Sequence, residues 1–306
     1  MSNFFRNLKI YRLTDNFPSI TVLAEKLAIK RLTPCDATTP KTFGWIPPRG
    51  NPEEFIVSAN GHHLIVLGSE QKVLPAAVVK QHVAERAKQI EEQQGEKPGR
   101  KQLRDLREQI TEELLAKAFS KHGQTAVWID AAGRWMGINA ASPARVEEVI
   151  DHLKLTLEEL PIIPLNPSIS PQTAMTDWLA AEEAPSAFTI DQDCDLQAMS
   201  EQKEAIRYTR HTLSIEDIRP HLEAGKRAIR LALTWNDRIS FVLSDDFSIK
   251  RIAFLDILKQ QSEQDAEQGK DALEADVAIL GGSFSEMAGD LLAALGGPCI
   301  GEATAA

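Results

Sequence analysis

Three strand-like runs follow one another in the last third of the chain, with only two or three residues between them. They cover residues 226–235, 238–244 and 248–254, and the connections are Asn236-Asp237 and Asp245-Asp246-Phe247. Connections this short imply an antiparallel meander. Together with the helical periodicity found elsewhere, they predict an α+β fold of mixed or antiparallel sheets with flanking helices.

The first of these runs is also the most basic. Side chains alternate along a strand, which predicts one surface formed by Lys226, Ala228, Arg230, Ala232 and Thr234, with Ile229, Leu231 and Leu233 on the other. Two cations separated by alanines make a surface that a bulky polyanion can approach closely. This interpretation requires Lys226 and Arg230 to be available to phosphate rather than paired with carboxylates.

The net charge of the 306-residue chain is −10, which disfavours a nucleic-acid partner until it is divided along the sequence. Residues 177–204 carry −7 and residues 256–306 carry −8, which leaves +5 on the remainder. Local patches rather than total charge decide whether phosphate is attracted, because salt screens charges beyond about 8 Å. The alternative interpretation is that the two acidic segments are ordinary solvated surfaces with no bearing on a nucleic-acid partner.

Cysteine usage and hydropathy favour a cytoplasmic protein. Cys35, Cys194 and Cys299 are widely separated and form no C-x-x-C pair, so neither a zinc site nor a disulfide framework is implied. The N-terminus has no apolar leader, and no segment approaches the roughly 18 apolar residues of a membrane span.

A charged helical pair is expected between residues 76 and 122. Narrow apolar stripes run along 76–90 and 103–114, and Pro98-Gly99 breaks the run between them. The two helices can bury only one seam, against each other, so we expect either a projecting hairpin arm or a solvated pair lying flat on the body. Where the chain leaves the second helix, Phe119 lies close to Lys117. Its ring either packs into the core of its own domain or contacts another subunit.

The other expected elements are read from periodicity and from turn residues. Helices are expected at 19–30, 143–155, 171–178, 214–224, 255–266 and 283–295; strands at 5–13, 63–68, 126–130, 134–139, 188–191 and 206–213; a rigid loop at 44–50 and an extended edge at 160–165.

Further cations extend the candidate binding surface. Arg207 and His211 would share one face of the strand at 206–213, with Arg210 opposite, and Lys250-Arg251 lies on the last strand of the meander. Such side chains bind phosphate oxygens without reading base edges, so binding would be independent of sequence. Alternatively, the cations lie over apolar neighbours or pair with the acidic helices.

No catalytic constellation accompanies these residues. The chain lacks G-x-x-x-x-G-K-[ST], G-x-S-x-G and H-E-x-x-H, and adjacent His62 and His63 would project to opposite faces of a strand. A metal-dependent nuclease using Asp130, Asp245 and Asp246 is the alternative function, and a dimeric scaffold without DNA affinity is a third. We expect no enzyme activity, cofactor or metal.

Several short segments together resemble the recombination-associated protein RdgC family, in order and over essentially the full chain. They are Phe4–Leu13, Thr33-Pro34-Cys35, Gly44–Pro48, Lys72–Pro75, Ala118-Phe119-Ser120, Trp128-Ile129-Asp130, Leu160–Leu165 and Glu223–Lys226.

The resemblance implies a bacterial, nucleoid-associated protein that binds duplex DNA with little sequence preference and restrains RecA-promoted recombination. It also implies a ring-shaped homodimer that is positive within and negative outside, with DNA threading the central hole. Phe119 matches an aromatic of the tip contact, and Lys117 a basic residue beside it. The DNA-binding set is then Lys117, Arg207, Arg210, His211, Lys226, Arg227, Arg230, Lys250 and Arg251.

Three domains are expected from these elements. Residues 1–75 with 123–170 would form a central α+β domain, residues 76–122 a helical-hairpin tip, and residues 171–306 an α+β base domain.

Overall fold

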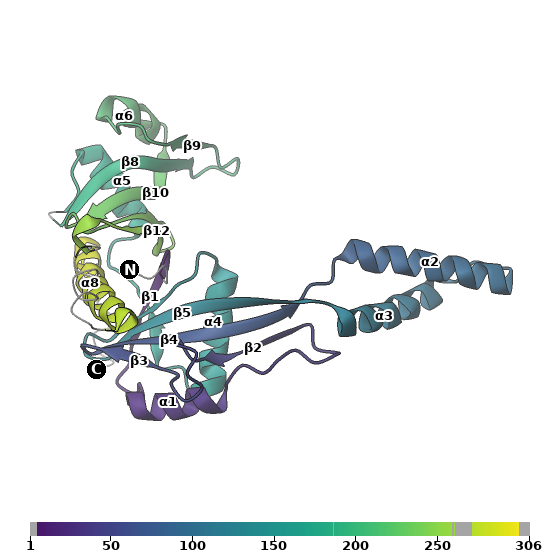
Figure 1. Ribbon diagram of the computed structural model, residues 1–306. Helices are drawn as coiled ribbons and strands as arrows, with labels where there is room; N and C mark the ends of the chain where they lie inside the picture. The colour runs from purple at the N-terminus through teal and green to yellow at the C-terminus, as the bar shows by residue number, and fades with distance from the viewer. Residues whose placement is uncertain (1–4, 186, 259, 261–270, 300–306) are drawn as a thin grey trace. The chain divides into compact units, whose positions relative to one another are not determined.

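The computed structural model of the chain describes residues 5–185, 187–258, 260 and 271–299 (Figure 1). The fold is α+β, as the sequence predicts. Two compact units are distinguished: unit 1 comprises Met1–Lys26, Pro47–Val66 and Thr125–Ala306, and unit 2 comprises Leu27–Ile46 and Leu67–Gln124. The three-domain division made from the sequence stays a prediction.

Unit 1 is built on an antiparallel sheet whose strand order includes β5-β6-β1-β12-β11-β10-β8-β9. The predicted meander is confirmed, since β11 pairs with both β10 and β12 in antiparallel register. The strands are β1 (Leu8–Leu13), β3 (Val57–Ala59), β6 (Trp135–Ile138), β7 (Ile162–Pro164), β8 (Phe188–Ala198), β9 (Ala205–Tyr208), β10 (Lys226–Trp235), β11 (Ile239–Ser244) and β12 (Ser248–Phe254). Two longer strands, β4 (His62–Lys72) and β5 (Ser120–Asp130), continue from one unit into the other.

Two tight turns use residues that tolerate the left-handed backbone region. Asn60 and Gly61, with φ of 49° and 81°, join β3 to β4. Asn236 and Asp237, with φ of 46° and 52°, join β10 to β11. Asn, Asp and Gly adopt positive φ at lower cost than other residues, which explains why the chain reverses at these points.

The helices of unit 1 cover the sheet, and α8 (Ala272–Ala294) contributes most to its core. Phe284 of α8 is fully buried and packs edge-on against Phe5 and Trp128, with ring centroids 5.4 and 5.6 Å away. The other helices are α4 (Pro143–Leu157), α5 (Pro171–Ala181) and α6 (Ile215–Glu223), while α1 (Ile20–Ile29) runs from unit 1 into unit 2.

Helix α8 also corrects the expectation that no segment is long and apolar enough to span a membrane. Among the described residues it alone passes that test of length and composition, and half of its apolar window is buried inside the protein. A buried core helix passes the same test, and the packing of α8 on Phe5 and on Trp128 of the sheet is of that kind.

In unit 2, α2 (Ala76–Gln94) and α3 (Arg100–Lys117) pack against each other, and Figure 1 shows them side by side. Val79, Leu106 and Ile110 are buried at the centre of the seam, and the partly buried residues around them are Leu74, Val83, Ala87, Ile90 and Leu114. The predicted pairing of the helices along one apolar seam is therefore confirmed. Whether the pair projects as an arm stays a prediction.

The predicted rigid loop at 44–50 is wrong in its first half. Gly44, Trp45 and Ile46 belong to strand β2 (Lys41–Ile46), and the prolines end that strand rather than define the segment. Gly44 is required there because a Cβ at this position would lie 2.2 Å from the backbone of Leu32.

Other boundaries also differ from the prediction. The strand expected at 206–213 ends at Tyr208, and the one expected at 188–191 extends to Ala198. The last helix begins at Ala272 rather than at residue 283. The helix expected at 255–266 lies largely outside the described residues.

Candidate nucleic-acid interface

A β-bulge in β10 determines where its cations point. Ala228 is paired with Leu196 of β8, but the next paired residue of β10 is Arg230, opposite Asp195. Ile229 is therefore an extra residue on this strand. A bulge interrupts the strict alternation of side chains along a strand. Residues after the bulge therefore point to the face opposite to the one that simple alternation from the residues before it would predict.

The prediction that Lys226 and Arg230 share a surface is consequently wrong. Lys226 lies on the face of Ala228, which is fully buried, and only 12% of its side chain is exposed. Arg227 and Arg230 instead share the opposite, outer face of β10, and both are exposed.

The outer face of β8 to β12 in unit 1 contains a pocket of about 560 Å³, which we call the arginine pocket. Four cations and two carboxylates line it, together with polar residues that include Asn7 and Tyr208. The cations are Arg207, Arg230, Lys250 and Arg251, and the carboxylates are Asp193 and Asp195. Two positive charges are thus in excess. All four cations belong to the predicted DNA-binding set.

Three of these cations already have carboxylate partners. Arg207 makes two hydrogen bonds to Asp195, of 2.9 and 3.2 Å, and Nη1 of Arg230 lies 3.3 Å from the same carboxylate. Nη1 of Arg251 lies 3.5 Å from Oδ2 of Asp193. The predicted availability of Arg230 to phosphate is therefore only partial.

Lys226 is likewise paired, with its Nζ 3.6 Å from Glu204. Arg227 donates to the backbone carbonyls of Leu222 and Lys226, at 3.4 and 3.0 Å. Lys226 thus lies on the buried face of β10, whereas Arg227 is an exposed cation on its outer face.

The residues after β9 do not alternate as predicted, because the strand ends at Tyr208 and Arg210 has a φ of 52°. The backbone N–H of Arg210 donates to Asp193 at 2.8 Å, and Nδ1 of His211 lies 2.7 Å from the carbonyl of Thr212. The His211 ring also packs on Tyr208, with centroids 5.5 Å apart. Both residues are exposed beside the pocket-lining strand.

Sequence reasoning missed the two carboxylates of the arginine pocket. Asp193 and Asp195 come from the acidic segment 177–204, which was expected to lie away from the cations. In the structure, β8 carries part of this segment directly beside the basic strand β10. Acidic and basic side chains therefore lie side by side in this part of unit 1, and the division of a ring into a positive inside and a negative outside stays a prediction. The alternation of Asp191, Asp193 and Asp195 was the signal in the sequence that could have placed these carboxylates on one face of a strand.

The remaining predicted residues lie in unit 2. Lys117 ends α3 and is exposed, and Phe119 follows it with 87% of its surface exposed. The carbonyl of Phe119 accepts a hydrogen bond from the backbone of Val73 at 2.8 Å, so the backbone is held while the ring projects. A Phe that plugs its own domain would be buried, and this alternative is excluded within the described chain.

Two of the three acids of the nuclease alternative have structural hydrogen bonds through their side chains, while Asp245 is exposed in the turn between β11 and β12. Asp130 is buried and accepts hydrogen bonds from the backbone of Gly133 and from Ser285, at 2.8 and 2.7 Å. Asp246 accepts from the backbone and hydroxyl of Ser248, at 3.1 and 2.8 Å. Within the described ranges, no group of three or more His, Cys, Asp or Glu side chains is arranged to hold a metal ion.

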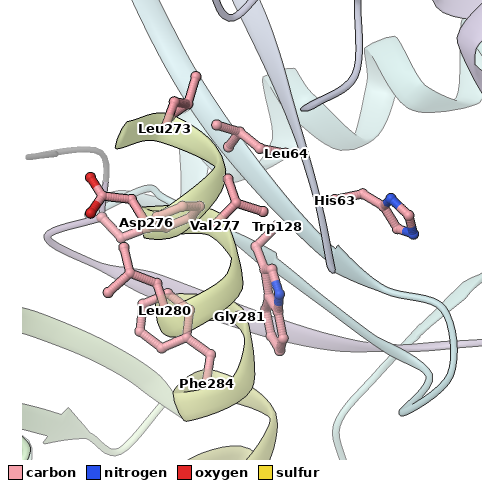
Figure 2. A pocket seen from close by; sticks show the side chains of 10 residues that line it. His63, Leu64, Trp128, Leu273, Asp276, Val277, Leu280, Gly281 and Phe284 are labelled. Atoms are coloured by element: carbon pink, nitrogen blue, oxygen red, sulfur yellow. The ribbon is translucent and has the colours of Figure 1, made fainter. Parts of the chain in front are cut away.

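A second pocket, beside α8, is too small for a substrate. Figure 2 shows Trp128, Leu280 and Phe284 around it, with the His63 ring directed away from the helix. Its volume of about 10 Å³ is close to the minimum that holds one water molecule. Nearby, burial lowers the pKa of His62, and the Asp130 carboxylate opposes this shift. This region is part of the core.

Comparisons with known proteins give a consistent family. A family model described as "RdgC: Putative exonuclease, RdgC" matches residues 3–298. The chain is 44% identical over 295 residues to the recombination-associated protein RdgC of Janthinobacterium sp. (strain Marseille), covering 96% of this chain and 98% of the relative. It is 46% identical over 296 residues to the protein of the same name from Cupriavidus pinatubonensis, with 96% and 98% covered. The chain therefore belongs to the RdgC family of recombination-associated proteins.

Proposed function

We propose that this protein binds double-stranded DNA without sequence preference through the arginine pocket and its exposed rim, and that it thereby restrains RecA-promoted recombination in the bacterial nucleoid. The observation that carries the proposal is the gathering of Arg207, Arg230, Lys250 and Arg251 around one pocket of a chain whose net charge is −10. Arginine and lysine at such a surface contact phosphate oxygens, which every DNA sequence presents alike.

The proposed interface includes cations outside the pocket as well. Arg210, His211 and Arg227 are exposed on the neighbouring segments of unit 1 and would extend the contact along the DNA backbone. Lys226 is a weaker candidate than the sequence suggested, because its side chain is mostly buried and its ammonium group is paired with Glu204. The proposed contact set therefore centres on the outer face of β10.

We further propose a ring-shaped homodimer in which the α2–α3 pair is a projecting arm and Phe119 contacts the partner. An exposed aromatic residue on a backbone held by a hydrogen bond is suited to an interface core. A closed two-fold assembly uses the same patch on both subunits. Lys117 would then lie at the rim of this contact.

Salt-dependent binding tests the proposed function. We expect the wild-type protein to shift duplexes of unrelated sequence with equal affinity. Log affinity should fall with log salt with a slope of at least about 1.8 per pocket, because two positive charges are in excess there and each contributes about 0.9. Electrophoretic mobility shifts over a salt series measure both quantities. Absence of a shift at low salt would contradict the proposal.

The same duplexes test the enzymatic alternative, which the description of the family model favours. Incubation with Mg²⁺ should leave end-labelled DNA intact if the protein only binds it. Cleavage that is lost in Asp245→Ala would identify a nuclease instead.

The proposed subunit contact predicts a change of mass. A ring of two subunits closes through two separate contacts, one at the arm tips and one at the opposite ends. Phe119→Asp should therefore lower the mass from dimer towards monomer on dilution, at concentrations where the wild type stays dimeric, since a carboxylate buried at the tip contact is costly to desolvate. Light scattering coupled to size exclusion measures the mass. Ile29→Asp, at another exposed apolar residue of unit 2, is the control and should leave the mass unchanged. An unchanged mass for Phe119→Asp would remove this residue from the interface.

A further inference from the structure

Asp195 lines the arginine pocket and is the partner of two guanidinium groups at once. It accepts two hydrogen bonds from Arg207, and Nη1 of Arg230 lies 3.3 Å from its Oδ2. The bulge in β10 creates this arrangement, because it sets Arg230 directly opposite Asp195. Only 14% of the Asp195 side chain is exposed.

The two arginines are much more accessible than the carboxylate that holds them. Their side chains are 67% and 45% exposed. Another anion can therefore reach the guanidinium groups from the solvent side. Taking them from Asp195 leaves a largely buried carboxylate without partners, which costs free energy. A phosphate group fits the planar fork of an arginine in the same bidentate way as a carboxylate.

We propose that Asp195 is an internal competitor of the DNA backbone for Arg207 and Arg230. This inference rests on the proposed function and adds how that site is regulated. In the free protein the carboxylate satisfies both guanidinium groups, and a DNA phosphate must displace it or share them with it. The affinity of the pocket is thereby held below what its four cations alone would give.

Asp193 has a different part in the same pocket. One of its oxygens accepts the backbone N–H of Arg210 at 2.8 Å, and the other faces Arg251 at 3.5 Å. Changing Asp193 would therefore disturb the chain after β9 as well as the charge. Asp195 is the cleaner position for a test, because among the described residues its side chain is hydrogen-bonded to arginines only.

The competing role and a positioning role for Asp195 give opposite results. If the carboxylate competes with phosphate, its neutralisation raises affinity. If it instead orients the two arginines for DNA, its neutralisation lowers affinity because the guanidinium groups lose their fixed geometry. The direction of the change decides between them.

The experiment measures duplex binding by Asp195→Asn over a salt series. We expect affinity at intermediate salt to rise about three- to tenfold, and the slope against log salt to steepen by about 0.9 per pocket, because one more positive charge is in excess. Asp237→Asn is the matched control: it removes the same charge at the β10–β11 turn, where a φ of 52° suits Asn, and should leave the slope nearly unchanged.

Unfolding curves establish that the variants are folded, and Asp195→Ser is a second neutral variant if Asn is not tolerated. Unchanged or weaker binding by a folded neutral variant would overturn the inference. Failure of the wild type to bind DNA while Asp195→Asn binds would support the inference and count against the proposed function in the native protein. If neither the wild type nor the folded neutral variant binds DNA, both the inference and the proposed function are wrong.

Discussion

The double variant in which Gln replaces both Arg207 and Arg230 should bind duplex DNA about tenfold or more weakly at intermediate salt. The reason is electrostatic: the variant retains Lys250 and Arg251 but also both pocket carboxylates, so the excess positive charge of the pocket falls to zero. Each lost charge should also reduce the slope of log affinity against log salt by about 0.9. The two effects together distinguish lost phosphate contacts from general unfolding.

The control must remove the same charge elsewhere in unit 1. Arg134 and Arg238 are suitable, because each is exposed and paired with one carboxylate, that of Asp15 and that of Glu286 respectively. Changing both to Gln should leave the affinity within about twofold of the wild type. If this control weakens binding as much as the pocket variant, the charge of the whole protein rather than the pocket governs binding.

A third variant connects this result with the internal competitor. Adding Asp195→Asn to the double variant removes a carboxylate that has lost both arginine partners and lies largely buried. Asp195→Asn should raise binding less in this background than in the wild type, because no arginine is left to release and only the repulsion between the carboxylate and phosphate is removed. An equal gain in both backgrounds would show that Asp195 acts through its charge alone and not by competing for the arginines.

Gly44→Ala should destabilise unit 2 by about 3 kcal/mol, the upper end of the usual cost of overpacking. Its Cβ would lie 2.2 Å from both N and Cα of Leu32, and 2.5 Å from the carbonyl carbon of Arg31. These are backbone atoms held by the hydrogen bond from Leu32 N to Trp45 O, of 3.0 Å, so no side chain can move aside. Thermal or denaturant unfolding measures the change.

Gly99→Ala is the matched control in the same unit. Gly99 precedes α3 with a φ of −68°, and an added Cβ would meet nothing within 4 Å. Ala is a poorer N-cap than Gly, but it also lowers the entropy of the unfolded chain by a similar amount, so the free energy of unfolding should change by only a few tenths of a kcal/mol. Equal destabilisation by both substitutions would contradict the packing argument at Gly44.

The sequence was most informative where local chemistry determines structure. Short connections at Asn236-Asp237 and 245–247 predicted the meander correctly, and the stripe through Val79 and Ile110 predicted the seam of the helical pair. In each case the decisive contacts are made by neighbouring elements, so periodicity and turn residues carry the information.

The candidate site was harder to predict, because it depends on pairing between strands that are distant in sequence. The cations Arg207, Arg230 and Lys250 were identified from composition, but alternation placed Lys226 beside Arg230. The extra residue in β10 is defined only by its register with β8. A carboxylate thirty-five residues earlier, that of Asp195, is brought to Arg230 by the same register.

The single seam of the α2–α3 pair has a consequence for how the length of this protein can vary. Because the buried residues of both helices face each other, one helix can gain or lose turns if the other does the same, with no repacking elsewhere in unit 2. Two matched turns, about seven residues in each helix, would change the span of the pair by about 11 Å. Insertions and deletions among relatives should therefore occur in balanced pairs on either side of Pro98. They would change the length of the helical pair and leave the rest of the fold as it is.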